Sequence, residues 1–231
     1  MTTSEPIRTT AMYRRQQAVG ARFTEGAGWR VADVYTSIEE ETARARGAVG
    51  LGDVSACGKL GIRGETVEAL GMKLTGSTLP PVGRASRERV NGASVLLCRR
   101  AGDEVLLLTT AEEYPVVADV VARTVAGAGC VHLTDLTSAF AGVDVMGPGL
   151  GALLERVVPL DLATVPALGI VQGELAHVHA LMVRLDRPTL PVVRVLVQRE
   201  HGDFVWQTLC DAGIDLGLTP VGAAAHARLM A

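Results

Sequence analysis

Hydrophobic and polar positions follow the same order twice along this chain. An extended stretch from Asp53 to Gly64 leads into a helical pattern of apolar residues, and a second stretch from Asp135 to Gly147 leads into another. The apolar positions of the two helical patterns are Val67, Leu70 and Leu74, then Leu150, Leu153, Leu154, Val157 and Val158. Each helix is followed by a proline-containing connection that ends in glycine, at 80–83 and 166–169. This spacing predicts a duplicated unit, with a ligand cleft between its halves.

The repeat also predicts how the chain is organised. We expect an α+β fold of two pseudo-repeated β-α-β units, the first α+β repeat over residues 51–130 and the second over residues 131–231. Residues 1–50 are predicted to form an N-terminal arm with a short helix at 13–20, followed by a capped helix. The capping box is Ser37 to Glu40, because a serine at the N-cap accepts from the third helical amide.

Several local signals place individual elements. Asn91-Gly92 supplies two residues that tolerate positive φ and predicts a tight hairpin turn between 87–90 and 93–98. In the second half, residues 170–185 alternate as in extended structure and 192–198 read as a strand. The next pattern predicts a helix that ends at Gly213 and buries one face, made of Phe204, Val205 and Leu209.

Composition excludes several classes of protein. The chain is 48% hydrophobic and 3% aromatic, so aliphatic residues must build its core. A net charge of −3 with no basic face argues against a nucleic-acid partner, and no apolar run approaches the roughly 20 residues that span a bilayer. The N-terminus shows no hydrophobic signal segment, and the four cysteines are scattered in apolar patterns. We therefore expect a cytoplasmic protein with reduced thiols.

Charged residues near the repeated strands are the first candidates for a site. Asp53 and Lys59 are six residues apart on one strand face and would line a cleft, although a turn-capping aspartate and a solvated lysine are the simpler interpretation. Asp135 and Asp144 bracket the corresponding strand of the second repeat, where Asp135 is expected to cap. His132 is expected to be structural.

Metal and nucleophile motifs are weak. His177 and His179 stand two apart and would share one strand face, but no cysteine or carboxylate has matching spacing, so we predict no metal site. The sequence contains no phosphate-binding glycine-rich loop, no Gly-x-Ser-x-Gly and no Cys-x-x-Cys. No catalytic residue is assigned from these patterns.

Five colinear fragments resemble one known family. They are residues 20–23 with 28–29, residues 35–41, residues 47–55 with 58–59, residues 79–85, and residues 211–213 with 217–218 and 220–222. These fragments resemble, in order, the N-terminal part of the glycine cleavage T-protein (aminomethyltransferase) family. The resemblance implies the folate-binding fold of that family, without its C-terminal barrel because the sequence stops at Ala231. That length is similar to the gamma subunit of heterotetrameric sarcosine oxidase.

The resemblance implies tetrahydrofolate as cofactor, yet three family features are missing. The family's folate-proximal aspartate would fall in residues 90–95, which contain Ser94 and no acid. Its Gly-Glu-Asp-Gly turn falls at 189–192, and its late arginine falls near His226, with Arg228 nearby. The remaining cofactor-binding candidates are Asp53, Lys59, Arg84 and Asp144, with Arg84 meeting an anionic folate tail or a partner carboxylate unless it is simply a surface arginine.

Three functions remain open. The first is an accessory subunit that packs on a larger flavin- and folate-binding oxidase subunit, or that self-associates. The second is a free-standing tetrahydrofolate-dependent methyl or aminomethyl transferase, or demethylase, that uses a relocated acid such as Asp53 or Asp144. The third is a repurposed fold that binds a less polar molecule beside Leu190 and Ala93.

Overall fold

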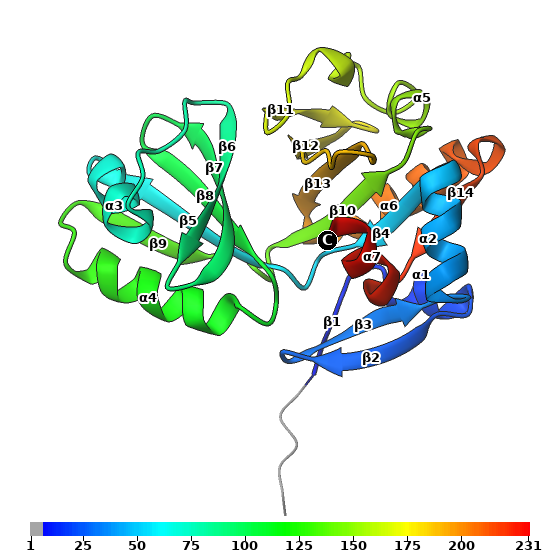
Figure 1. The fold of residues 1–231 in the computed structure, drawn as a ribbon, viewed down its shortest axis with the longest axis horizontal. Coiled ribbons are helices and arrows are strands. Elements are labelled where there is room, and N and C mark those ends of the chain that lie inside the picture. The colour runs from blue at the N-terminus through cyan, green and yellow to red at the C-terminus, as the bar shows by residue number, and fades with distance from the viewer. Residues whose placement is uncertain (1–6) are drawn as a thin grey trace, which may run out of the picture.

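The computed structural model describes residues 7–231 and contains two sheets of related topology side by side (Figure 1). The first sheet has the strand order β6-β7-β8-β5-β9. Its strands are β5 (Gly58–Gly64), β6 (Arg84–Val90), β7 (Ala93–Ala101), β8 (Glu104–Thr109) and β9 (Val131–Asp135). Helices α3 (Val67–Thr75) and α4 (Tyr114–Ala126) pack beside each other against this sheet.

The second sheet has the order β11-β12-β13-β10-β4-β14. Its strands are β4 (Val49–Asp53), β10 (Phe140–Met146), β11 (Ile170–Leu175), β12 (Val178–Arg184), β13 (Val192–Gln198) and β14 (Leu218–Val221). The connecting elements are α5 (Leu150–Leu154), α6 (Gly202–Ala212) and the short 3-10 turns Leu162–Thr164, Arg199–His201 and Ile214–Leu216. Helices α2 (Ile38–Gly47) and α7 (Ala223–Met230) pack on each other beside β4 and β14.

The two orders show that the repeats exchange one strand. β6, β7, β8 and β5 correspond to β11, β12, β13 and β10, but the next position is filled by β9 in the first sheet and by β4 in the second. β4, which precedes the first repeat, pairs with β10, and β9 pairs with β5. The sequence-based boundary at residue 130 therefore lies just before a strand that completes the first sheet. The expected α+β fold with two pseudo-repeated units is confirmed.

The exchange occurs at two equivalent turns. The carboxylate of Asp53 accepts from the Ser55 amide at 2.9 Å, and that of Asp135 accepts from the Thr137 amide at 2.8 Å. The Ser55 hydroxyl accepts from the Gly142 amide at 3.0 Å, while the Thr137 hydroxyl accepts from the Lys59 amide at 3.1 Å. The same short motif thus ties each turn to the opposite repeat.

Lys59 holds the two turns together. Its Nζ donates to the carbonyl oxygens of Ser55 (2.9 Å), Cys57 (2.8 Å) and Thr137 (3.4 Å). The expected solvated lysine is wrong, because Lys59 is fully buried (0% exposed). Burial lowers the pKa of its ammonium to about 8. The expected capping roles of Asp53 and Asp135 are confirmed by the turn geometry.

The proline-glycine connections form a second link between the repeats. The Ala85 amide donates to the Leu168 carbonyl at 2.7 Å, and the Ile170 amide donates to the Gly83 carbonyl at 2.8 Å. The edge strands β6 and β11 are therefore joined at their beginnings. Between the sheets lies an apolar cluster with members from both, among them Leu106, Leu108, Leu181, Leu190, Leu196 and, from α7, Leu229.

The N-terminal segment is more ordered than the sequence indicated. α1 (Tyr13–Ala18) matches the expected short helix, but the rest of the predicted arm forms a separate sheet of β1 (Arg8–Thr9), β3 (Trp29–Val34) and β2 (Arg22–Gly26). Ala27 and Gly28, both at positive φ, make the tight turn between β2 and β3. The part of the arm at 1–6 lies outside the described residues.

Local expectations hold in most elements and fail in three. The Ser37 cap is present, and Asn91-Gly92 forms the β6–β7 turn with φ of 50° and 83°. α5 is shorter than its apolar pattern, because it ends before Val157. Phe204 is 50% exposed instead of buried, since the buried face of α6 is formed by Val205, Trp206 and Leu209. His177 lies in the β11–β12 turn at φ 65°, so it does not share a strand with His179.

Replacing Lys59 with methionine should destabilise the protein. Three carbonyl oxygens would lose their donor, which predicts a loss of about 1–3 kcal/mol in the free energy of unfolding near neutral pH. The control is Lys73→Met on the exposed face of α3, which should change stability little. Chemical denaturation measures both; a Lys59→Met variant as stable as Lys73→Met would contradict this role.

The same two variants should also differ in how their stability depends on pH. Because the pKa of Lys59 is about 8 in the folded protein and has the ordinary lysine value of 10.5 in the unfolded chain, the unfolded chain binds more protons between these values. The contribution of Lys59 therefore makes wild-type stability rise as pH rises through this interval. The Lys59→Met variant lacks this rise and Lys73→Met keeps it, so the stability gap between wild type and Lys59→Met should widen with pH.

Candidate functional site: an arginine-lined cleft between the repeats

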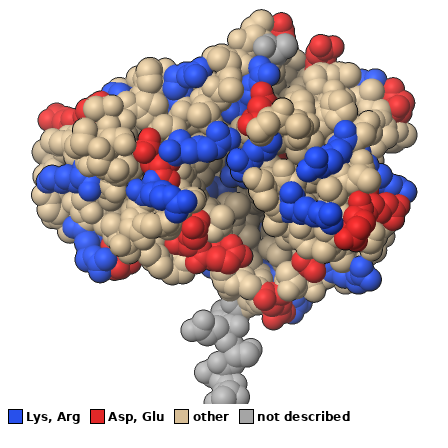
Figure 2. Space-filling view, in the orientation of Figure 1, with Lys and Arg blue, Asp and Glu red and all other residues tan. Residues whose placement is uncertain are grey.

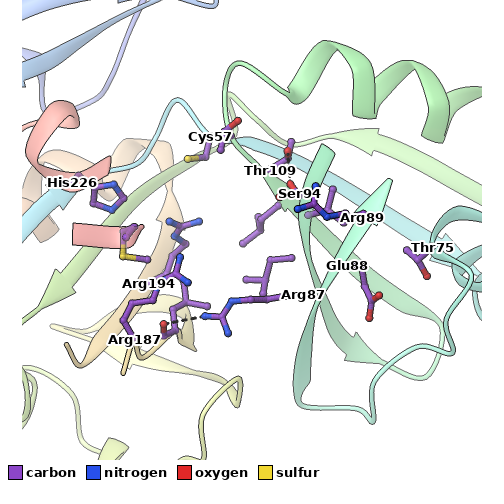
Figure 3. A pocket seen from close by; sticks show the side chains of 16 residues that line it. Cys57, Thr75, Arg87, Glu88, Arg89, Ser94, Thr109, Arg187, Arg194 and His226 are labelled. Atoms are coloured by element: carbon purple, nitrogen blue, oxygen red, sulfur yellow. Dashed lines mark hydrogen bonds between the residues drawn. The ribbon is translucent and has the colours of Figure 1, made fainter. Parts of the chain in front are cut away.

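A cleft of about 690 Å³ opens between the two sheets. Figure 2 shows the molecule hollowed between its halves, with basic side chains gathered around the opening. Residues from β6, β7 and β8 form one wall, and residues from the β12–β13 connection, β13 and α7 form the other (Figure 3). The polar groups on these walls include Arg87, Glu88, Arg89, Ser94, Thr109, Arg187, Arg194 and His226.

A buried carboxylate anchors the second wall. Asp144 on β10 lies opposite Arg194 on β13 in the strand register. Its two oxygens accept from Nε and Nη2 of Arg194, each at 2.8 Å, and one of them also lies 2.8 Å from Nε2 of His226 on α7. Asp144 is 0% exposed, whereas Arg194 and His226 reach the cleft. The arrangement fixes a guanidinium and an imidazole at the cleft surface.

The electrostatics of this cluster keep Asp144 ionised. Burial alone would raise the pKa of its carboxyl, but the Arg194 charge and the hydrogen bonds from Arg194 and His226 hold that pKa well below its usual range. The same carboxylate raises the pKa of Arg194 against the effect of burial. Asp144 is therefore a fixed counterion. It neither reaches a ligand nor exchanges a proton near neutral pH.

The other sequence-predicted residues lie away from the cleft walls. Asp53 accepts from Nε2 of Gln16 at 2.8 Å and from the Ser55 amide, so both of its oxygens are occupied. Lys59 is buried in the crossing of the repeats. Arg84 opens β6 and is half-buried where the two edge strands join. Of the four candidates, only Asp144 belongs to the cleft cluster, and it contacts the cleft through Arg194 and His226.

The arginines and Glu88 are residues that sequence reasoning missed. Arg194 interrupts an otherwise apolar strand, which is a signal for a buried ion pair and was available from the sequence. Arg87 and Arg89 alternate along β6, but nothing in their spacing shows that this face meets a second sheet. Glu88 is the one carboxylate among the described residues that line the cleft.

A thiol near this cluster does not form a nucleophilic site. Cys57 lines the cleft with His226, and Asp144 bonds to His226 as the third member of a triad would. However, burial raises the pKa of Cys57 above its usual value, and within the described residues no hydrogen bond joins the thiol to the imidazole. An activated cysteine requires the opposite shift.

The histidines of the β11–β12 hairpin give no metal centre. His177 lies in the turn and His179 on β12 opposite Glu174. Among residues 7–231 no group of three or more histidine, cysteine or carboxylate side chains is arranged to hold a metal ion. His132, expected to be structural, is exposed on β9. No helix in this part of the chain is long and apolar enough to cross a membrane.

Fold and cleft together define a class of duplicated α+β domain with a cleft between the repeats. The model of the GCVT N-terminal domain matches residues 12–230, and the chain belongs to this family. The resemblance seen in the sequence is thereby confirmed.

Individual relatives agree with this membership. The aminomethyltransferase of Saccharopolyspora erythraea is 29% identical over 223 residues, which cover 93% of this chain and 60% of that protein. The chain thus spans about 60% of the length of the curated relatives it matches.

Two solved structures have the same fold. The glycine cleavage system aminomethyltransferase T from Bartonella henselae superposes with a TM-score of 0.84 at 17% identity, covering 97% of this chain and 62% of that one. A chain of heterotetrameric sarcosine oxidase from Corynebacterium sp. U-96, in complex with pyrrole 2-carboxylate, superposes with a TM-score of 0.68 at 22% identity. That match covers 93% of this chain and 98% of the other.

Replacing Asp144 with asparagine should be severely destabilising. The change leaves the Arg194 guanidinium buried without its counterion, which predicts a loss of about 3–5 kcal/mol in the free energy of unfolding. Asp103→Asn is the control, because its ion pair with Arg63 is exposed and should contribute less than about 1 kcal/mol. Urea denaturation compares them.

A double variant separates the charge from the packing. Asp144→Val combined with Arg194→Leu should recover most of the stability lost in Asp144→Asn, because no unpaired charge remains. If the double variant were as unstable as Asp144→Asn, the loss would not come from the uncompensated guanidinium.

Proposed function

We propose that this chain is a noncatalytic accessory component of a folate-linked assembly that oxidises or demethylates amines and transfers one-carbon units. The observation that carries the proposal is the sequestration of both candidate acids. Asp144 is fully buried and paired, and Asp53 is held by Gln16 and its own turn. Neither carboxylate can meet a substrate amine in the cleft.

The chemistry of the family explains why this matters. Transfer of a one-carbon unit develops positive charge on nitrogen, and a carboxylate beside the folate nitrogens stabilises it. In this chain the hairpin where the resemblance places that acid lines the cleft with Ser94, whose neutral hydroxyl carries no compensating charge. The opposite wall presents Arg187, whose charge would repel a developing cation, and Arg194, whose charge is balanced by Asp144.

Tetrahydrofolate stays part of the proposal as a ligand of the assembly. The cleft has a volume in the range of small-molecule and cofactor sites. Its walls nevertheless offer a heterocycle only one carboxylate, Glu88, among the described residues. The cleft is therefore large enough for a ligand of this size, but it offers few of the acidic groups that one-carbon transfer requires.

The proposed partner is a larger flavin- and folate-binding subunit, with self-association as the alternative arrangement, in the cytoplasm. The fold match to a chain of a heterotetrameric oxidase over 98% of that chain supports an assembly of this kind. In such an assembly the catalytic carboxylate belongs to the partner, and this chain contributes its scaffold and cleft.

A second candidate function is a free-standing tetrahydrofolate-dependent transferase or demethylase. It is favoured by one observation, the location of Glu88 on the cleft wall. A third candidate, a fold repurposed for a less polar ligand, draws less support. Leu190 and Ala93, the apolar replacements that motivated it, are both buried and neither lines the cleft.

The test is to isolate the tagged chain from its native cells and to assay tetrahydrofolate-dependent one-carbon transfer. The chain should copurify with a flavin-containing protein and should show no transfer by itself. Calorimetric titration with tetrahydrofolate establishes separately whether the isolated chain binds the cofactor. A stable monomer recovered without a partner would contradict the accessory role.

Turnover by the isolated chain would favour the second candidate, and two variants identify its acid. Glu88→Gln should then abolish transfer while tetrahydrofolate binding remains. The control Glu39→Gln, at an exposed position on α2, should leave turnover unchanged. If transfer survived Glu88→Gln, the acid of this candidate would not be a described carboxylate on the cleft wall.

A further inference from the structure

Arg87 extends from the first repeat across the cleft to the second. It lies on β6, and its Nη2 donates to the carbonyl oxygen of Leu185 at 3.2 Å, just after β12 (Figure 3). The bond uses one of the five N–H donors of the guanidinium. The remaining donors lie at the cleft, which Arg87 lines.

Arg187 lies two residues beyond Leu185 on the opposite wall. Its backbone is fixed by two hydrogen bonds with Leu190, at 2.8 and 3.1 Å, which close the β12–β13 connection. Its side chain makes no hydrogen bond or ion pair within the described residues, and its Nε is buried without an acceptor. An unsatisfied buried donor on a charged group is uncommon in a folded protein and needs an explanation.

The two guanidiniums are close enough to disfavour each other. Burial, and then the like charge of Arg187, lower the pKa of Arg87. The nearby acids do not balance them, because Asp186 is bound to Arg184 at 2.6 Å and to the Val192 amide at 3.1 Å. Glu88 also lines the cleft, but its side chain points away from Arg87 (Figure 3). Asp144, the remaining acid of this wall, is occupied by Arg194.

We propose that Arg87 and Arg187 form a binding site for a small anion bearing a carboxylate or phosphate group, held between the two repeats. Planar guanidiniums match the paired oxygens of both groups. The anion would accept from the orphaned Nε of Arg187 and from free donors of Arg87, and it would neutralise two charges that the fold brings together. The site does not depend on the accessory role, because an anion can bind here in either case.

Calorimetry on the intact chain tests the site, with inorganic phosphate and glutarate as the two probes. At least one anion should bind to the wild type, and which one binds identifies the group. Arg187→Gln should weaken that binding by about tenfold or more, because it removes a charged donor pair. The control Arg123→Gln, on α4 and paired with Asp119 at 2.7 Å, should bind as the wild type does.

Thermal unfolding without added anion provides a second readout. Arg187→Gln removes a like-charge neighbour of Arg87 and no side-chain hydrogen bond of its own, so its midpoint should equal or exceed that of the wild type. A purely structural arginine would lower the midpoint on removal. The proposal is overturned if neither anion binds the wild type, or if Arg187→Gln binds it as well as Arg123→Gln does.

Discussion

The exchange of β4 and β9 between the repeats is the constraint on which the rest of this structure depends. Each strand completes the sheet of the other repeat: β4 pairs with β10, in a sheet whose other strands all lie after residue 139, and β9 pairs with β5. The turns that follow these strands are tied to the opposite repeat through Ser55 and Thr137, and Lys59 binds carbonyl oxygens from both turns. The two halves are thus held at a set separation at one end of the cleft, while the edge strands join them at the other.

Much of this architecture was predictable because it rests on local chemistry. Asn91-Gly92 specifies a hairpin turn through its own backbone preference, and Ser37 caps the helix that follows it by accepting from the amide three residues later. The repeat was visible because Asp53 and Asp135 each accept a hydrogen bond from the amide two residues later. Signals of this kind lie within a few consecutive residues, so they can be recognised without knowledge of the tertiary fold.

What was not predictable depends on partners far away in the sequence. Lys59 looks like a surface residue until strand exchange surrounds it with carbonyl oxygens from residue 137 as well as residues 55 and 57. Asp144 resembled a relocated acid because its pairing with Arg194, 50 residues away, is set by the β10–β13 register. His177 was misplaced because Ala176 and His177 both adopt positive φ in a turn without glycine, which residue type does not favour.

The charge distribution of the cleft connects the fold to the proposed function. A transferase needs a negative group that faces a substrate amine, whereas this fold buries Asp144 behind Arg194 and leaves guanidiniums at the surface. The field inside the cleft therefore favours anions over amines, and low-dielectric walls strengthen that preference. A partner that supplied a carboxylate would reverse the preference locally without any change in this chain. In the proposed assembly, the absence of transfer by the isolated chain and the retention of its cleft would be two consequences of the same arrangement of charges.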